Sequence, residues 1–189
     1  MDLVRPAKPH LPSYVDALDR GWSPDPDSPD IVATERQRIA DDPERFLALM
    51  DDREALGGPV TFPDGSTGAR IPGVRRWLWD GEFCGYLGLR WMPGTLELPP
   101  YCLGHIGYAV VPWKRRRGYA TQALRQALPL AAAEGLPAVT ITTDPDNLAS
   151  QRVIEANGGV LVGCFDLPES HGGGMGLEYR IDLRQLGGG

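Results

Sequence analysis

The segment from His105 to Thr121 constrains the fold of this chain more than any other part of it. An apolar, strand-like run ends at Pro112, a basic turn follows, and beyond Gly118 the sequence becomes alanine-rich with helical spacing. This order predicts a strand, a short loop and the N-terminus of a helix. Because the first-turn N–H groups of a helix have no partner within it, and the helix dipole adds partial positive charge, such an end favours an anion, usually a phosphate.

The predicted turn also carries charge and backbone freedom. Gly118 has no Cβ, so the backbone can come close to a ligand there. The basic run from Lys114 to Arg117 adds full positive charge, in a chain of 189 residues whose net charge is -6. That acidic balance argues against general nucleic-acid binding and makes the local basic cluster stand out. The sequence therefore predicts one local anionic ligand at this turn.

A second informative segment follows downstream. Residues 138–143 are a β-branched run typical of a strand, residues 144–146 form a turn, and a short helical stretch then ends at Gly158 and Gly159. Asn147 stands where a helix N-cap is expected, which is its commonest role at such a position. We expect Asn147 to cap this helix and to contact a ligand as well.

Together the two segments resemble the GNAT family of N-acetyltransferases. The hexapeptide from Arg115 to Ala120 fits the family signature Q/R-x-x-G-x-G/A, and the string Asp-x-Asp-Asn-x-x-Ser-x-x-Val-Ile-Glu-x-Asn-Gly-Gly is similar to its second cofactor-binding segment. The resemblance is good over residues 70–185 and only general over residues 1–70. It implies one α+β domain over residues 1–189, with a mixed, mostly antiparallel central sheet of about six or seven strands that splays open, and about four flanking helices.

The resemblance implies that acetyl-coenzyme A is the cosubstrate. Backbone groups of two valines would bind the pantetheine arm as an added strand would, and one of their N–H groups would polarise the acetyl carbonyl. Backbone N–H groups of residues 116–121 would hold the pyrophosphate, and three polar residues of the second segment would contact the arm and the adenine-side phosphate region. The predicted cofactor-binding residues are Val110, Val111, Arg115, Arg116, Arg117, Gly118, Tyr119, Ala120, Thr121, Asn147, Ser150 and Arg152.

The implied reaction is direct transfer of an acetyl group to a primary amine, for which proton-transfer groups are the open question. Many relatives have a tyrosine general acid at the position occupied here by Ile154, so Ser150 or a water would protonate the departing thiolate, or acid catalysis would be minor. His105 is a candidate base because its unperturbed pKa lies near 6.5. A structural, hydrogen-bonded His105 is the alternative, and Tyr108, Glu82 or a water relay could then supply the base.

The acceptor amine is not specified by the sequence. A small molecule, an amino acid or antibiotic, and a protein amino group all fit, and the acidic surface favours a cationic acceptor. An alternative function is a non-catalytic coenzyme A-binding module, which the residue at Ile154 and the ambiguous base support. A general nucleotide-phosphate binder is a third reading, but no Gly-x-x-x-x-Gly-Lys loop is present.

The remaining features favour a cytoplasmic bacterial protein, monomeric or homodimeric, with no metal, nucleic-acid or membrane partner. Three cysteines without Cys-x-x-Cys spacing indicate neither a disulfide framework nor a zinc site. No apolar leader or run of about 20 apolar residues is present. Trp113 is expected to be exposed and to cover the cofactor or a partner subunit. The glycine- and proline-rich residues 57–73 predict a hairpin, or a flap that gates the site.

Local patterns predict the individual elements. We expect helices over residues 11–22, 31–40, 42–50, 121–134 and 147–157. We expect strands over residues 2–6, 74–79, 83–91, 101–111, 138–143, 160–165 and 177–183. Pro129 should kink or shorten its helix, because proline removes a backbone donor.

Overall fold

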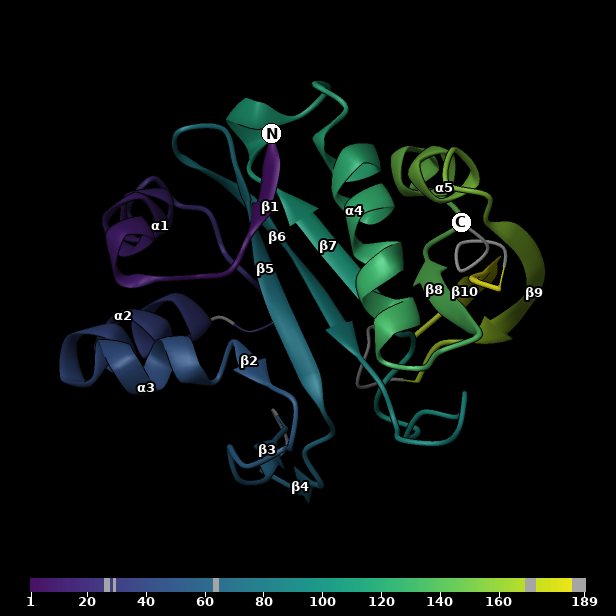
Figure 1. The fold of residues 1–189 in the computed structure, drawn as a ribbon, viewed down its shortest axis with the longest axis horizontal. Helices are drawn as coiled ribbons and strands as arrows, with labels where there is room; N and C mark the ends of the chain where they lie inside the picture. Colours follow the sequence, from purple (N-terminus) through teal and green to yellow (C-terminus); the bar gives the residue numbers. More distant parts are fainter. Residues whose placement is uncertain (26–27, 29, 63–64, 169–172, 185–189) are drawn as a thin grey trace. The chain divides into compact units, whose positions relative to one another are not determined.

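A computed structural model describes residues 1–25, 28, 30–62, 65–168 and 173–184 (Figure 1). Its residues divide into two compact units. The first unit comprises residues 1–88 and 108–119, and the second comprises residues 89–107 and 120–189.

The first unit is a sheet with helices. Its elements are β1 (Asp2–Val4), the 3-10 helix η1 (Lys8–His10), α1 (Leu11–Asp19), α2 (Ile31–Asp41), α3 (Pro43–Ala48), β2 (Asp51–Asp52), β3 (Val60–Thr61), β4 (Thr67–Gly68), β5 (Gly73–Trp79), most of β6 (Phe83–Arg90) and β7 (Ile106–Val110), and the 3-10 helix η2 (Pro112–Lys114). The strand order is β1-β5-β6-β7, with β2 also paired to β5 (Figure 1). Antiparallel pairing matches Val4 with Trp77 and Asp51 with Val74, so β1 and β2 border opposite ends of β5.

An aromatic cluster forms the core of this unit. Tyr14 of α1 stacks on Trp77 of β5 with ring centroids 4.5 Å apart and meets Phe83 of β6 edge-on at 4.9 Å. Trp22 packs against Phe83 at 5.0 Å. Each well-oriented aromatic pair contributes about 0.5–1.5 kcal/mol beyond the area it buries. The cluster therefore fixes α1 on the sheet through side chains that come from three separate segments.

Two glycines allow the β5–β6–β7 arrangement. Gly81, in the turn between β5 and β6, has φ +107°. Gly85 of β6 has φ +141°, and a Cβ there would lie 2.0 Å from the carbonyl oxygen of Ala109. Since Cβ and oxygen cannot approach so closely, β6 and β7 can lie this near each other only because residue 85 has no side chain.

The second unit contains α4 (Tyr119–Ala133, of which Tyr119 belongs to the first unit), β8 (Ala138–Thr143), α5 (Leu148–Glu155), β9 (Val160–Asp166) and β10 (Met175–Asp182). Its sheet has the order β8-β10-β9. The central strand β10 is antiparallel to both neighbours, and it pairs Tyr179 with Ile141 and Leu177 with Cys164. The α+β class is therefore confirmed.

Within the described residues, the strands form a five-stranded sheet, a three-stranded sheet and a short hairpin, and there are five α-helices, in agreement with the expected α+β class. Two local predictions need correction. The strand expected over residues 101–111 begins only at Ile106. Pro129 does not shorten α4, which continues to Ala133. Its buried stripe, which includes Leu124 and Leu128, offsets the single backbone hydrogen bond that proline removes.

The predicted hairpin within residues 57–73 is present as the antiparallel pair β3–β4. Residues 63 and 64, which come between β3 and β4 in the chain, lie outside the described residues. A gating role for this hairpin stays a prediction.

Candidate functional site

The predicted strand–turn–helix is present. β7 ends at Val110, η2 follows, and α4 begins at Tyr119. Arg116 and Gly118 both have left-handed backbones, with φ +61° and +73°. For a residue with a side chain, this conformation costs roughly 1–2 kcal/mol, so the turn holds Arg116 in a strained geometry. Arg115 and Arg117 are exposed along with Arg116, and all three guanidinium groups can meet an incoming anion.

The two valines that were predicted to bind the pantetheine arm differ in the hydrogen bonds of their backbones. The Val111 N–H donates to the Cys84 carbonyl at 3.0 Å, and the Val111 carbonyl accepts from the Lys114 N–H at 3.0 Å. Both backbone groups of Val111 are therefore already bonded within the protein, which does not fit the role in ligand binding that was expected of them. Because strand residues alternate, the Val110 backbone faces the other edge of β7, where its carbonyl accepts from Arg115 Nε at 3.2 Å. The Val110 N–H is therefore the better placed donor.

A polar cluster that the sequence did not reveal holds the turn. Lys114 is only 8% exposed, and its Nζ lies 2.9 and 3.0 Å from the Asp80 carboxylate oxygens and 2.6 Å from Glu82 Oε1. The Tyr119 hydroxyl donates to Asp80 at 2.6 Å. Lys114 is thus neutralised by two carboxylates, and it does not join the three exposed arginines as a ligand for an anion. Asp80 contacts residues on both sides of the arginines.

The ionisation of this cluster agrees with its geometry. Burial alone would raise the pKa of Asp80, but hydrogen bonds from Tyr119 and Lys114 hold that pKa well below its usual range. Burial would lower the pKa of Lys114, but hydrogen bonds to Glu82 and Asp80 raise it. Both groups are therefore charged over the ordinary range of pH. Glu82, one of the candidate bases, is occupied as a partner of Lys114.

Trp113 anchors the turn on the first unit's core, which corrects the expectation that it is exposed. The indole is half-buried among the apolar residues that α1 and β5 contribute. The guanidinium carbon of Arg20 lies 3.7 Å from the centroid of its ring, a cation–π geometry. Trp113 and Lys114 together fix η2 immediately before the exposed arginines.

In the second unit, α5 begins as predicted. Asn147 is its N-cap, and its Oδ1 accepts from the Ser150 N–H at 3.0 Å. Ser150 is half-buried and Arg152 is exposed. Ile154 is completely buried, so the position of the family's usual tyrosine belongs to the core of this protein.

Asn157 joins α5 to the first turn of α4. Its amide nitrogen donates to the Thr121 carbonyl at 3.2 Å and to the Val153 carbonyl at 2.8 Å. Within the second unit, this contact brings the predicted phosphate residue Thr121 together with the helix that carries Asn147. The asparagine of the Asn-Gly-Gly string is visible in the sequence as part of a motif, but its bonding partner 36 positions away is not.

His105, in the second unit, is 1% exposed, and both its backbone and its ring bond to the backbone of Thr140. Its N–H donates to the Thr140 carbonyl at 2.8 Å, and its Nδ1 accepts from the Thr140 N–H at 3.0 Å. Burial lowers the pKa of His105, and the nearby Arg90 lowers it further. The ring is therefore neutral near pH 7 with its proton on Nε2. This geometry fits the structural alternative for His105.

The other catalytic candidates lie in different units. Tyr108 is half-buried in β7 of the first unit, and Ser150 belongs to α5 of the second. In the described part of the chain, no three His, Cys, Asp or Glu side chains gather where a metal ion could bind. No helix among these residues is long and apolar enough to span a bilayer.

Known proteins share this fold and its sequence pattern. A family model described as an acetyltransferase (GNAT) domain matches residues 22–160. None of the curated proteins matches the chain. Among solved structures, a ribosomal L7/L12 alpha-N-protein acetyltransferase, RimL, in complex with coenzyme A aligns with 95% of this chain and 92% of its own at 17% identity and a TM-score of 0.59.

Two further solved structures align with this chain. The microcin C7 self-immunity acetyltransferase MccE, in complex with acetyl-CoA and AMP, aligns with 95% of this chain and 91% of its own, at 12% identity and a TM-score of 0.58. A GNAT-family acetyltransferase from Bacillus anthracis is 23% identical, with a TM-score of 0.48. That alignment covers 58% of this chain and 66% of the Bacillus chain, just under two thirds of its length.

Proposed function

The chain belongs to the GNAT acetyltransferase family, and from this premise we propose that it transfers the acetyl group of acetyl-coenzyme A directly to a primary amine. The observation that carries the proposal is the turn before α4, where left-handed Arg116 and Gly118 accompany three exposed guanidinium groups at a helix N-terminus. RimL and MccE, which share the fold, bind coenzyme A and acetyl-CoA. We also propose a single domain over residues 1–189, because the family match includes segments of both units.

The cosubstrate would be held mainly by backbone groups. The N–H groups of residues 116–121 would bind the pyrophosphate, and the neighbouring arginines would balance its charge. The Val110 N–H would pair with the pantetheine arm or polarise the acetyl carbonyl. Asn147, Ser150 and Arg152 would contact the arm and the adenine-side phosphates. The fit rests on Gly118, which allows close approach of the backbone, and on the exposure of the arginines.

In the reaction, the neutral amine attacks the thioester carbon, the C–S bond breaks, and the acetylated amine loses a proton while the thiolate gains one. We propose that Ser150 or a water protonates the thiolate, since Ile154 is buried and carries no proton that it could donate. Tyr108 or a water relay would take the proton of the amine. His105, which is neutral and bonded to Thr140, would position the backbone.

Calorimetric titration with acetyl-CoA, coenzyme A and ATP tests the binding step. Selective micromolar binding of the two coenzyme A species is the expected result. Gly118→Asp should abolish it, because the new carboxylate fills the approach and repels the pyrophosphate. Gly94→Asp is a matched control, since Gly94 also has a left-handed backbone, φ +77°, and a Cβ added there would meet no other atom within 4 Å. Binding that survives Gly118→Asp would refute the phosphate assignment.

A coenzyme A-binding module without catalysis is the second candidate. The buried Ile154 and the engaged His105 favour it, because neither residue can then transfer a proton to a substrate. Thiol release measured across a panel of small amines, amino acids and peptides separates the two functions. Acetyl-CoA binding without turnover on any acceptor would support the module.

A further inference from the structure

The outer strand of the second unit's sheet exposes apolar side chains. β9 stands at one end of the strand order β8-β10-β9 (Figure 1). Val160, Leu161 and Val162 of this strand are 65%, 51% and 54% exposed. Met175, at the start of the neighbouring β10, is 54% exposed, and these residues are four of the six large hydrophobic side chains that are exposed in the described part of the chain. Contiguous exposed apolar side chains mark an interaction surface.

The backbone of β9 is unpaired on its outer side. Among the described residues, the backbone groups of residues 160–166 pair only with β10. The opposite edge of this sheet differs, because Thr140 of β8 donates its N–H to His105 Nδ1 and accepts the His105 N–H at its carbonyl. Every second residue of an edge strand points its N–H and C=O groups outward. β9 can therefore accept one further strand through main-chain hydrogen bonds.

Residues 160–166 lack most of the features that keep edge strands from pairing. They include no lysine, arginine or proline, and their one charged residue, Asp166, is the last of the strand. One protective feature is present. Gly163 pairs with Glu178 and Leu161 pairs with Tyr179, so Val162 is an extra residue in β9, as in a β-bulge. The bulge shortens the regular stretch that another strand can join, and it should therefore weaken such pairing without preventing it.

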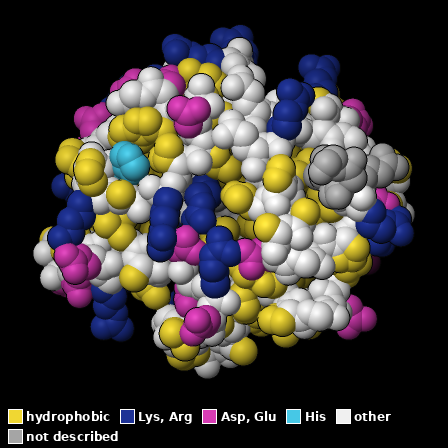
Figure 2. Space-filling model, in the orientation of Figure 1, with side chains coloured by type: hydrophobic (Ala, Val, Ile, Leu, Met, Phe, Trp, Pro, Cys, Tyr) yellow, Lys and Arg dark blue, Asp and Glu magenta, His cyan; other side chains and the backbone are white. Residues whose placement is uncertain are grey.

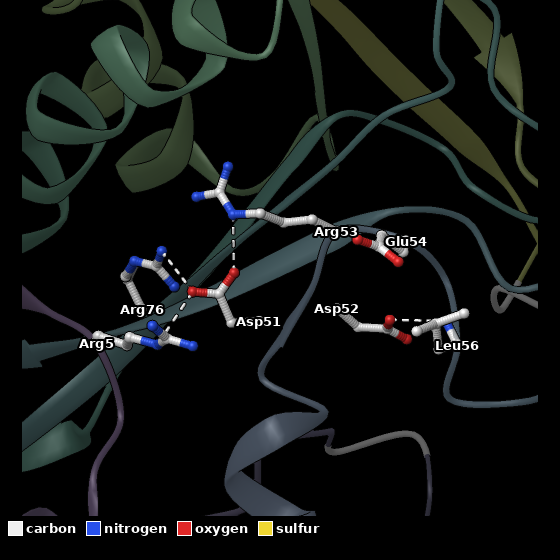
Figure 3. Close-up of a pocket in the computed structure, with 7 residues that line it drawn as sticks. All are labelled: Arg5, Asp51, Asp52, Arg53, Glu54, Leu56 and Arg76. Carbon is white, nitrogen blue, oxygen red and sulfur yellow. Dashed lines mark hydrogen bonds and ion pairs between the residues drawn. The ribbon is translucent and has the colours of Figure 1, made fainter.

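The charged surface of the first unit differs from this strand, because its charges pair within the protein. Figure 2 shows Lys and Arg side chains over β2 lying among Asp and Glu side chains. In the cleft beside β2, Asp51 accepts from Arg53 and Arg76, and Asp52 accepts from the Leu56 N–H (Figure 3). Such a surface needs no partner to compensate its charges. The outer edge of β9 has both unpaired backbone groups and exposed apolar side chains.

We propose that β9 pairs antiparallel with β9 of a second copy of this chain, so that two three-stranded sheets join across a twofold axis. An antiparallel pair of identical strands has this symmetry, and each copy presents the same residues to the other. In every register centred on residues 163–165, Asp166 lies opposite an uncharged residue, so no like charges meet. Because His105 occupies the β8 edge at Thr140, the assembly ends at two copies. The proposal does not depend on acetyl transfer.

The size of the contact sets the expected affinity. A strand of seven residues is about 23 Å long, and with a sheet thickness of about 10 Å the edge offers roughly 230 Å² on each copy. The apolar side chains on both faces of β9 enlarge this area, but it stays below the area of about 800 Å² that each partner buries in a stable complex. We therefore expect a dimer with a micromolar Kd, which dissociates on dilution.

Sedimentation velocity of the full-length protein, from about 1 to about 500 µM, measures this equilibrium. Monomer at the lowest concentration and dimer at the highest are expected. The double substitution Val160→Lys and Val162→Lys should weaken dimerisation about tenfold or more, because it brings like charges together along the shared edge. Leu56→Lys is the matched control, since Leu56 is 78% exposed in the first unit, and its Kd should be unchanged. Melting temperatures verify that each variant is folded.

Cys164 reports whether β9 itself forms the contact. It is exposed, whereas Cys84 and Cys102 are buried. The proposed pairing places the two copies of Cys164 within about 10 Å of each other, so a short bismaleimide should link them. Cys164→Ser should remove the link. A protein that is monomeric at about 500 µM, a dimer unaffected by the double lysine substitution, or a dimer that is not linked through Cys164 would each overturn the proposal.

Discussion

Asp80→Ala tests whether the polar cluster behind the basic turn supports cosubstrate binding. The substitution removes both oxygens that contact Lys114 Nζ at 2.9 and 3.0 Å and the acceptor of the Tyr119 hydroxyl. Lys114 would keep Glu82, whose side chain is 48% exposed, as its remaining carboxylate partner. The lysine would then turn outward or stay buried with less compensation, and in either case the link between η2 and the β5–β6 hairpin would weaken.

The magnitude follows from burial. Breaking a fully buried ion pair costs about 3–5 kcal/mol. The Asp80 side chain is 16% exposed and Glu82 remains, so we expect a smaller loss of about 1–3 kcal/mol in the free energy of unfolding. The turn should then populate geometries that do not bind acetyl-CoA, and a loss of about 1.4 kcal/mol in binding is a tenfold weaker Kd.

Urea denaturation and calorimetric titration with acetyl-CoA, below the unfolding transition of each variant, measure the two effects. Asp182→Asn is a matched control, because it also removes a carboxylate from an ion pair, the exposed pair that Asp182 makes with Arg184 two positions away. Asp80→Asn should be intermediate, since an amide oxygen still accepts from Tyr119 but carries no charge. If Asp80→Ala changes the Kd for acetyl-CoA by less than twofold, no more than Asp182→Asn does, the supporting role assigned to Asp80 is refuted.

Three other substitutions test local geometry. Arg116→Gly should be up to about 1 kcal/mol more stable in urea denaturation than Arg116→Ala, because only glycine relieves the left-handed backbone strain. Both substitutions should weaken acetyl-CoA binding, and equal stabilities of the two variants would contradict the assigned strain. Gly85→Ala should lose about 3 kcal/mol or more, because its Cβ would meet the Ala109 carbonyl, and a near-native melting temperature would exclude that contact. His105 has a lowered pKa, so below about pH 6.5 the unfolded chain binds a proton that the folded chain does not. Stability should therefore fall from about pH 6.5 downward by at most about 1.4 kcal/mol per pH unit, and His105→Gln should lack this part of the slope in urea titrations at several pH values.

Elements governed by nearby residues were predictable from the sequence. Asp42 before Pro43 opens α3 and accepts from the Arg45 N–H, Asn147 caps α5, and Asp80-Gly81 makes the hairpin turn. The two capping residues bond to an N–H group three positions away, and Gly81 adopts a positive φ that glycine readily allows. Such signals do not depend on the rest of the fold.

Elements governed by distant partners were not predictable. Lys114 belongs in the sequence to a run with three arginines. Its partners Glu82 and Asp80 are 32 and 34 positions away, in the turn between β5 and β6. The strand expected from residue 101 begins later, and just before it His105 bonds to Thr140. The Val111 N–H is used by Cys84, a residue whose pairing cannot be read from either segment alone.

The residues that would touch the cosubstrate and the residues that hold them therefore differ in kind. The former are backbone groups and exposed arginines grouped in two short segments, and their order alone indicated a phosphate turn. The latter, Asp80 and Asn157, each donate or accept across more than 30 positions to fix one of those segments. Substitution of a supporting residue should change affinity through the population of the binding geometry, so its effect should shrink when temperature is lowered or when the turn is stabilised. Loss of a contacting group such as an arginine should persist under both conditions, because no rearrangement of the turn replaces the missing charge.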